Sequence, residues 1–270
     1  MKTNIKFNNY EIIFINFLEK YINLYYPNKR KPKYSNKYYL EYIYYVLKTG
    51  VPWFLLTCKC HFTSVYKKFI YWTNNKVFFN FYNSNLNLYI KTRLLNKNYF
   101  NNIYIDSTHI KNIKGEDVIG SNHYDRYRNS TKYHVIVDEN KIPLSYKFTA
   151  GNVHDVNTTM SLAEPLININ MDKRRVLTLI ADKGYISKNN KEKLEANNIN
   201  LVYPLKKNNI NNINNNKNKN ILKSRYLVEY HFNDIDKYRR LILRYERKIS
   251  IVESLHLLAF SKLIINKLQD

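Results

Sequence analysis

Two short apolar runs in this chain each lead into an aspartate. Residues 103–106 end at Asp106, and residues 176–181 lead into Asp182. A buried strand that ends on a carboxylate holds that charge rigidly at the edge of a sheet, where it can bind a hard cation. Two such carboxylates in one strongly basic chain indicate metal-assisted chemistry on a phosphodiester. For either aspartate alone, capping of the turn after the strand is the better interpretation.

A third carboxylate is needed to hold two divalent ions about 4 Å apart for in-line phosphoryl transfer. Arg225 and Glu229 are four residues apart and therefore share one face of a predicted helix. A surface ion pair between these two side chains explains the same spacing. Spacing alone does not choose among the acidic residues after Asp182, which are Glu229, Asp234, Asp236, Glu246 and Glu253.

The charge balance indicates the class of partner. The chain has 270 residues, enough for one or two domains, with 44 Lys and Arg against 21 Asp and Glu, for a net charge of +23. This balance favours a polyanion, either nucleic acid or an anionic membrane surface. An excess of Asn, Lys, Ile and Tyr is typical of AT-rich coding sequence, so part of the charge reflects genome composition.

Targeting signals and cysteine chemistry are weak in this sequence. The sequence contains no run of about 18 apolar residues, the length that would predict a membrane-spanning helix. Residues 1–9 lack the apolar core of a signal peptide. Two cysteines cannot build a disulfide framework. Cys58, Cys60 and His61 lie too close together for a zinc site and have no second ligand pair. We therefore expect a soluble intracellular protein.

The N-terminal third is predicted to be helical. Residues 10–95 contain an aromatic-rich helix over 38–47 that stops at Gly50, and an amphipathic helix over 63–72. Short helices with a basic face fit a helix-turn-helix-like DNA-binding unit, and a plain helical subdomain with a solvated lysine face fits equally well. Trp53 and Trp72 are assigned to the core.

The remainder of the chain alternates between strands and helices, which predicts a mixed sheet with helices packed on it. A low-complexity Asn/Lys tract over 206–220 predicts a mobile loop. The predicted strands are 103–106, 133–137, 144–148, 176–181 and 201–203, and the predicted helices are 156–169, 188–196, 222–246 and 250–267.

Several segments resemble one family when they are taken together in order. The segments are Tyr45 to Trp53, Val65 to Trp72, Tyr104-Ile-Asp-Ser-Thr-His109, Thr131 to Asp138, Ile142 to Leu144, Ala150-Gly-Asn-Val-His-Asp155, Ile180-Ala-Asp-Lys-Gly-Tyr185, Arg225 to Phe232 and Tyr238 to Lys248. They lie between about residues 38 and 265, and they are similar to bacterial insertion-sequence transposases of the DDE type, in the group typified by insertion sequence number five.

The resemblance implies a fold and a triad of metal ligands. Asp106 and Asp182 become the two metal-binding aspartates, and Glu229 becomes the third acid. The implied fold is RNase H-like, a mixed five-stranded sheet flanked by helices over 99–270, preceded by a helical DNA-binding leader over 1–98. Two ions, Mg²⁺ or Mn²⁺, are implied as cofactors.

The resemblance also implies the reaction and the partners. Water cuts DNA at the end of the element, and the freed 3′-hydroxyl attacks target DNA. The implied partner is double-stranded DNA, at the element ends and at the target, bound by a homodimer inside the cell and without a membrane. Two alternatives remain open: a domesticated or decayed DNA-binding protein without catalysis, and a nuclease of the same fold that only cuts.

Supporting residues are predicted from charge and position. His154 and Asp155 are predicted to shape the site, although a turn-capping role explains them equally well. Phosphate contacts are predicted for six cations, each of which fits an ordinary solvated charge as well: Lys132, Lys183, Arg225, Arg239, Arg240 and Arg244.

Overall fold

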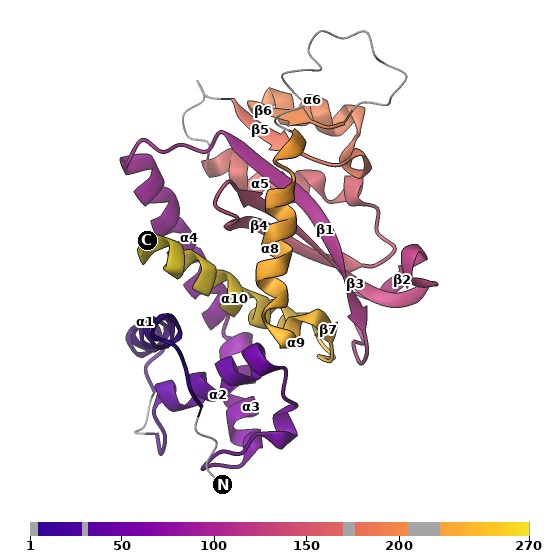
Figure 1. The fold of residues 1–270 in the computed structure, drawn as a ribbon. Coiled ribbons are helices and arrows are strands. Elements are labelled where there is room, and N and C mark those ends of the chain that lie inside the picture. Colours follow the sequence, from indigo (N-terminus) through magenta and orange to yellow (C-terminus); the bar gives the residue numbers. More distant parts are fainter. Residues whose placement is uncertain (1–4, 29–31, 170–175, 205–221, 270) are drawn as a thin grey trace. The chain divides into compact units, whose positions relative to one another are not determined.

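The computed structural model describes residues 5–28, 32–169, 176–204 and 222–269. The chain forms two compact units (Figure 1). We call residues 1–96, 113–115 and 235–270 the helical unit, and residues 97–112 and 116–234 the sheet unit. The Asn/Lys tract predicted as a mobile loop, residues 206–220, lies outside the described residues.

The N-terminal helices of the helical unit follow the predicted pattern. They are α1 (Asn9–Tyr25), α2 (Asn36–Thr49), η1 (Trp53–Leu55), α3 (Phe62–Asn74) and α4 (Val77–Leu95). Helix α1 begins with a capping box, in which the Asn8 side chain accepts from the Glu11 backbone and the Glu11 side chain accepts from the Asn8 backbone. Helix α2 ends, as predicted, at Gly50, whose left-handed φ of +73° suits a residue without a Cβ.

The predicted single helix over 222–246 is wrong. The structure has α8 (Tyr226–Asp236), a break, α9 (Arg239–Ile242) and the short strand β7 (Leu243–Arg244). Tyr238 lies in the break with extended backbone, and its buried ring packs edge-on against Tyr44 at 6.3 Å. Burying this ring in the helical unit interrupts a segment whose sequence contains no breaker.

Helix α10 (Ile249–Gln269) is a core element of the helical unit. Helix α10 packs against α4, where the ring centroids of Tyr82 and Phe260 lie 5.9 Å apart. Among the described helices it alone is long and apolar enough to cross a membrane, but 67% of its apolar window is buried in the fold, as in a core helix. Helices α9 and α10 belong to the same compact unit as the N-terminal helices. The domain boundary at 98/99 stays a prediction.

The sheet unit contains the predicted mixed sheet; its assignment as RNase H-like stays a prediction. Strands β1 (Asn102–Asn112), β3 (Arg128–Asp138) and β4 (Pro143–Ala150) pair antiparallel, and β5 (Leu177–Ile180) and β6 (Ile199–Val202) continue the sheet parallel to β1. The order is β4-β3-β1-β5-β6, and a short strand that was not predicted, β2 (Gly120–Asn122), pairs with β3.

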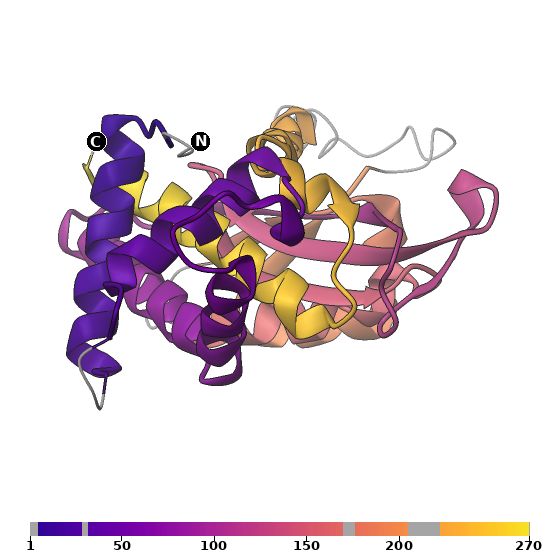
Figure 2. The same ribbon diagram turned by 90° about the horizontal axis from the view of Figure 1, so that it is seen from below.

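Helices cover both faces of this sheet. Helix α8 lies on one face, and α5 (Thr159–Ile169) lies on the other; α6 (Lys188–Ala196) packs against β6 (Figures 1 and 2). Tyr133 of β3 marks the α8 face, because its hydroxyl lies 2.8 Å from Nε2 of His231 on α8. His134, the next residue, marks the α5 face, where its ring reaches the Thr158 hydroxyl at 3.4 Å.

Strand register assigns the polar residues of β1 to these two faces. Asp106 pairs with Val135, Ser107 with His134 and His109 with Lys132. Residues paired across antiparallel strands share a face, and consecutive residues point to opposite faces. Asp106 therefore lies on the α8 face, and Ser107 lies on the α5 face.

Candidate active site

Asp106 and Asp182 emerge at the same edge of the sheet unit. The parallel pairing of β1 with β5 ends at Tyr104 and Ile180, so each aspartate lies two residues beyond the last pair. The prediction that Asp106 ends its strand is wrong, because pairing with β3 carries β1 on to Asn112. The pairing with β5 does stop before Asp106, which leaves its side chain open to the strand end that carries Asp182.

Each aspartate is oriented by a neighbouring backbone N–H. The Ser107 amide donates to Oδ1 of Asp106 at 2.8 Å, and the Lys183 amide donates to Oδ1 of Asp182 at 2.7 Å. Asp182 thereby caps the short helix η4 (Lys183–Tyr185). Asp182 therefore does cap a turn, as one interpretation of the sequence predicted. The cap uses Oδ1, so Oδ2 is available to bind a cation.

The guanidinium of Arg225 bridges the two aspartates. Its Nη2 lies 3.5 Å from Oδ2 of Asp106, and its Nη1 lies 3.5 Å from Oδ1 of Asp182. Nε of Arg225 is buried without a hydrogen-bond partner among the described residues. Burial raises the pKa of Asp106; the Ser107 amide and Arg225 oppose that shift, and the charges of Asp182 and Asp155 add to it. The two carboxylates thus share a single cation.

Glu229 lies one helical turn beyond Arg225, on the face of α8 that continues from it. Buried Val228 and His231 hold α8 to the sheet, and Glu229 is exposed. Within the described ranges, no three His, Cys, Asp or Glu side chains are grouped so that they could hold a metal ion. The structure therefore brings Asp106 and Asp182 together, and the role of Glu229 as the third acid stays a prediction.

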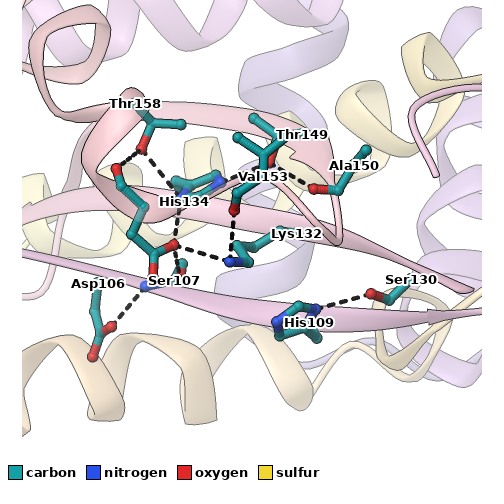
Figure 3. A network of polar contacts seen from close by, with 11 residues as sticks. Asp106, Ser107, His109, Ser130, Lys132, His134, Thr149, Ala150, Val153 and Thr158 are labelled. Atoms are coloured by element: carbon teal, nitrogen blue, oxygen red, sulfur yellow. Dashed lines mark hydrogen bonds and ion pairs between the residues drawn. The ribbon is translucent and has the colours of Figure 1, made fainter. Parts of the chain in front are cut away.

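Asp155 is the centre of a polar network on the opposite face of the sheet. Figure 3 shows Ser107, Lys132 and His134 of this network. Its Oδ1 accepts from the Ser107 hydroxyl at 2.9 Å and from Nζ of Lys132 at 3.2 Å, and it lies 3.5 Å from Nδ1 of His134. Lys132 also donates to the Val153 carbonyl at 2.9 Å. These contacts tie the loop before α5 to strands β1 and β3, directly behind Asp106.

Burial sets the charge states in this network. It lowers the pKa of His134 to about 4, an effect that the negative charge of Asp155 only partly opposes. His134 is therefore neutral near pH 7, where its Nε2 lies 2.8 Å from the Thr149 hydroxyl. Lys132 is the cation that balances Asp155.

Tyr185 joins the network to the Asp182 segment. Its hydroxyl is buried, and burial raises its pKa, with the charge of Asp155 adding to the effect. A Cβ placed on the adjacent Gly184 would lie 3.4 Å from Oδ2 of Asp155, so η4 packs closely on η3 (Asp155–Asn157). The short helix that Asp182 caps thus packs against Asp155.

Sequence reasoning missed three residues of this site: Ser107, His134 and Tyr185. Ser107 and Tyr185 are adjacent to the predicted aspartates in the Asp-Ser-Thr-His and Ala-Asp-Lys-Gly-Tyr segments, so their position was a usable signal. His134 has no such signal, because only the pairing of β1 with β3 places it opposite Ser107.

Two residues predicted near the aspartates remain at the surface of the sheet unit. Lys183 is exposed directly after Asp182. His154 is also exposed, and its carbonyl accepts from the Asn157 amide. Lys132, by contrast, is buried and ion-paired, as described above. The DNA contacts predicted for Lys132 and Lys183 stay predictions.

The three predicted arginines of the helical unit have different surroundings. Arg239 is exposed. Arg240 is buried, and its Nη2 lies 2.6 Å from Glu246. Arg244 is buried as well, and it donates to the carbonyls of Glu246 and Arg247. The charges of Arg240 and Arg244 are thus used inside the fold, and phosphate contact by any of the three stays a prediction.

The donor set at the sheet edge suits a hard divalent cation. Asp106 and Asp182 present carboxylate oxygens, which Mg²⁺ and Mn²⁺ prefer. Both carboxylates already form ion pairs with one cation, the guanidinium of Arg225. The two aspartates therefore fit the implied metal, and Glu229 as a third ligand stays a prediction.

Comparison with protein families gives the assignment. Residues 102–264, more than half of the chain, match the family described as "Transposase DDE domain". The chain belongs to this family. The match begins with β1 and extends into α10, so it includes Asp106, Asp182 and Glu229. The narrower resemblance to the group of insertion sequence five stays a prediction.

Individual relatives of this transposase-family chain are distant. A putative transposase for insertion sequence element IS402 from Burkholderia cepacia is 28% identical over 141 residues, which cover 51% of this chain and 64% of that protein. The chain thus spans less than two thirds of that relative. The catalytic domain of Mos1 mariner transposase has a TM-score of 0.31 at 10% identity, over 68% of this chain and 91% of that one. A piggyBac transposase synaptic complex has a TM-score of 0.31 at 12% identity, over 40% and 23%.

Proposed function

We propose that this member of the transposase DDE family is an active DNA transposase. It binds the ends of its element, cleaves the DNA by metal-dependent hydrolysis and joins the freed 3′-hydroxyl to target DNA. The observation that carries the proposal is the pair Asp106 and Asp182, presented side by side from β1 and β5 and joined by one guanidinium. Paired carboxylates at a sheet edge supply two of the ligands that metal-assisted phosphoryl transfer needs.

Two ions, Mg²⁺ or Mn²⁺, are assigned to Asp106, Asp182 and Glu229. When bound, such ions supply an activated water and offset the charge that develops on the phosphate oxygens. The chain's own residues prepare this site. Ser107 and Lys183 orient the aspartates through their amides, and Arg225 offsets part of their negative charge before metal and DNA bind.

Asp155 acts as a positioning residue behind the metal ligands. It holds Ser107, next to Asp106, and packs against the helix that begins after Asp182. A site built in this way keeps its carboxylates in place before substrate binds, which lowers the cost of ordering them during the reaction.

The proposed partner is double-stranded DNA, at the element ends and at the target, inside the cell. The net charge of +23 attracts the phosphate backbone independently of sequence. Lys183 is exposed beside Asp182 and is the best placed of the predicted phosphate contacts. Joining two ends requires two active sites, so we propose that a homodimer assembles on DNA.

A DNA-binding protein without catalysis is the second candidate. The observation that favours it is the lack of a three-residue metal group within the described part of the chain, where Glu229 is exposed on α8. The other alternative, a nuclease that only cuts, uses the same two aspartates.

A nicking and joining assay separates these functions. The full chain is incubated with Mg²⁺ and duplex DNA from the borders of its gene, together with a supercoiled target. We expect border cleavage and joined products, both lost in Asp106→Asn and Glu229→Gln but retained in the matched variant Asp236→Asn. Cutting without joining indicates the nuclease, and binding without cutting indicates the non-catalytic protein. Joining that persists in Asp106→Asn contradicts the site assignment.

A further inference from the structure

A second candidate binding site lies in the helical unit. It is a cleft of about 860 Å³, a size typical of ligand pockets. Its walls come from the segment after α2, from the start of α3, from Lys114 and from the segment between α9 and α10. The predicted transposition chemistry uses none of its aromatic side chains.

The cleft has an aromatic wall whose geometry is fixed. Trp53 stacks on Phe69 with ring centroids 5.4 Å apart and meets Tyr66 edge-on at 5.2 Å. Trp53 is buried, as predicted, and its Nε1 makes no hydrogen bond within the described part of the chain. Phe69 and Tyr66 thus fix the Trp53 ring as part of the wall of the cleft.

Two further rings of the cleft are open to solvent. Phe54 is 65% exposed and Tyr245 is 40% exposed. The guanidinium of Arg240 lies 5.4 Å from the centroid of the Tyr245 ring, and the ion pair with Glu246 fixes that guanidinium in turn. Arg240 thus supports the Tyr245 ring, while part of the ring stays exposed.

The charges in the cleft suit an anion. Four cationic side chains and one carboxylate line it, and the carboxylate, Glu246, is paired with Arg240. Lys114 and Lys248 are exposed. The backbone amide of Lys114 donates to the Arg244 carbonyl at 3.1 Å, and the side chain of Arg244 donates to the carbonyls of Glu246 and Arg247. These bonds hold both lysine-bearing segments in place.

We propose that this cleft binds an unpaired nucleotide of DNA, with its base against Tyr245 and Phe54 and its phosphate on Lys114 and Lys248. Exposed aromatic faces beside cations are the chemistry that proteins use for unpaired bases. An acidic peptide would satisfy the lysines but would leave the aromatic rings without a matching partner. The inference relies on the proposed function only for the choice of DNA as the polyanion.

The test is binding of a short single strand that carries one 2-aminopurine, measured with the full chain in EDTA. We expect quenching of the 2-aminopurine on binding. We also expect about ten-fold weaker binding in Tyr245→Ala, with recovery in Tyr245→Phe, which keeps the ring. Tyr10→Ala, at an exposed tyrosine of α1, is the matched control and should leave affinity unchanged.

A strand with an abasic position in place of 2-aminopurine tests whether the base itself is bound. It should bind the wild type several-fold more weakly and should bind Tyr245→Ala no more weakly than the intact strand does. Lys248→Glu should weaken binding of both strands more than Lys193→Glu, an equal charge change at an exposed lysine of α6.

Equal affinity of the wild type for the intact and abasic strands overturns the proposal, as does unchanged binding in Tyr245→Ala. Displacement of the strand by poly-glutamate at equal charge concentration assigns the cleft to acidic peptides instead. Asp106→Asn should keep full quenching. Quenching without any cleavage or joining would therefore leave this inference intact and reject the proposed function. Cleavage and joining without quenching would support the proposed function and reject this inference.

Discussion

Arg225 reaches Asp106 with a guanidinium nitrogen 3.5 Å from the carboxylate oxygen, and its second terminal nitrogen reaches Asp182 at the same distance. One side chain from the turn before α8 thus connects the two strand edges that carry the aspartates. This arrangement makes Arg225 a cation already in place between two carboxylates. Any divalent ion that binds there competes with it or adds to it.

Replacement of Arg225 by glutamine is expected to make the protein depend on metal for stability. Without divalent ions the two carboxylates lose their shared cation and repel each other, so the thermal midpoint in EDTA should fall. Millimolar Mg²⁺ should then raise the midpoint more in the variant than in the wild type, because binding to the folded state stabilises it. Arg239→Gln removes an exposed arginine and serves as control. Equal Mg²⁺-induced shifts in the two proteins would contradict the shared-cation interpretation.

Loss of the ion pair between Lys132 and Asp155 should destabilise the sheet unit. Lys132 is nearly buried, so Lys132→Met leaves a partly buried carboxylate without its cation. We expect a loss of about 1–3 kcal/mol in urea unfolding, and the double variant Lys132→Met/Asp155→Asn should lose less than the sum of the single losses.

The control for this double-mutant cycle is the exposed pair Lys191 and Glu195 on α6, whose atoms lie 3.7 Å apart. Lys191→Met should change stability by less than about 0.5 kcal/mol. Additive losses at Lys132 and Asp155 would show that the two side chains act independently.

Protonation of His134 should contribute to acid destabilisation. Its pKa is lowered to about 4 by burial, whereas an unfolded histidine titrates near pH 6.5. Between these values the unfolded chain binds the proton and the folded chain does not, so stability falls as pH falls from about 6.5 to 4. The full window corresponds to a loss on the order of 3 kcal/mol.

His134→Gln tests this linkage, since it keeps a hydrogen-bonding side chain that does not titrate. As pH falls through that window, the free energy of urea unfolding should fall more in the wild type than in the variant. A constant difference from pH 7 to pH 4 would assign the acid sensitivity to other groups.

Gly50 should not tolerate a side chain at the end of α2. Its φ of +73° disfavours a Cβ, and a Cβ placed there would lie 3.1 Å from Cβ of Arg239. We expect Gly50→Ala to cost about 1–2 kcal/mol in urea unfolding. Gly184→Ala is the matched control, because its φ is not positive and its nearest contact is 3.4 Å away; it should be close to neutral. Equal losses in the free energy of unfolding for the two variants would contradict the claim that the positive φ of Gly50 excludes a side chain.

Local sequence predicted the elements that carry the chemistry. The apolar runs before Asp106 and Asp182 are strands, and the strand–helix alternation identifies a mixed sheet. The extension of β1 past Asp106 was not predictable, because pairing with β3 causes it and hydrophobicity does not. The break at Tyr238 has a similar origin, since burial of its ring against Tyr44 overrides helix propensity.

The candidate site was less predictable than the fold. Asp106, Asp182 and Arg225 lie in segments that the resemblance identifies. The two aspartates meet at the Arg225 guanidinium because of the register of β1 with β5, which the segments do not show. The polar network at Asp155 joins this residue to Ser107, which is 48 residues away in the sequence. No short motif predicts a contact between residues so far apart. Glu229 is supported by its segment and by its place one turn after Arg225.

The most direct test of the central claim changes the metal preference of one predicted ligand. Asp106→Cys replaces a hard oxygen ligand by a softer sulfur, which binds Mg²⁺ poorly and accepts Mn²⁺ better. If Asp106 binds the catalytic metal, cleavage of border DNA by this variant should be lost in Mg²⁺ and partly restored in Mn²⁺, while the wild type works with both. A variant that cleaves as well as the wild type in Mg²⁺ would contradict the account.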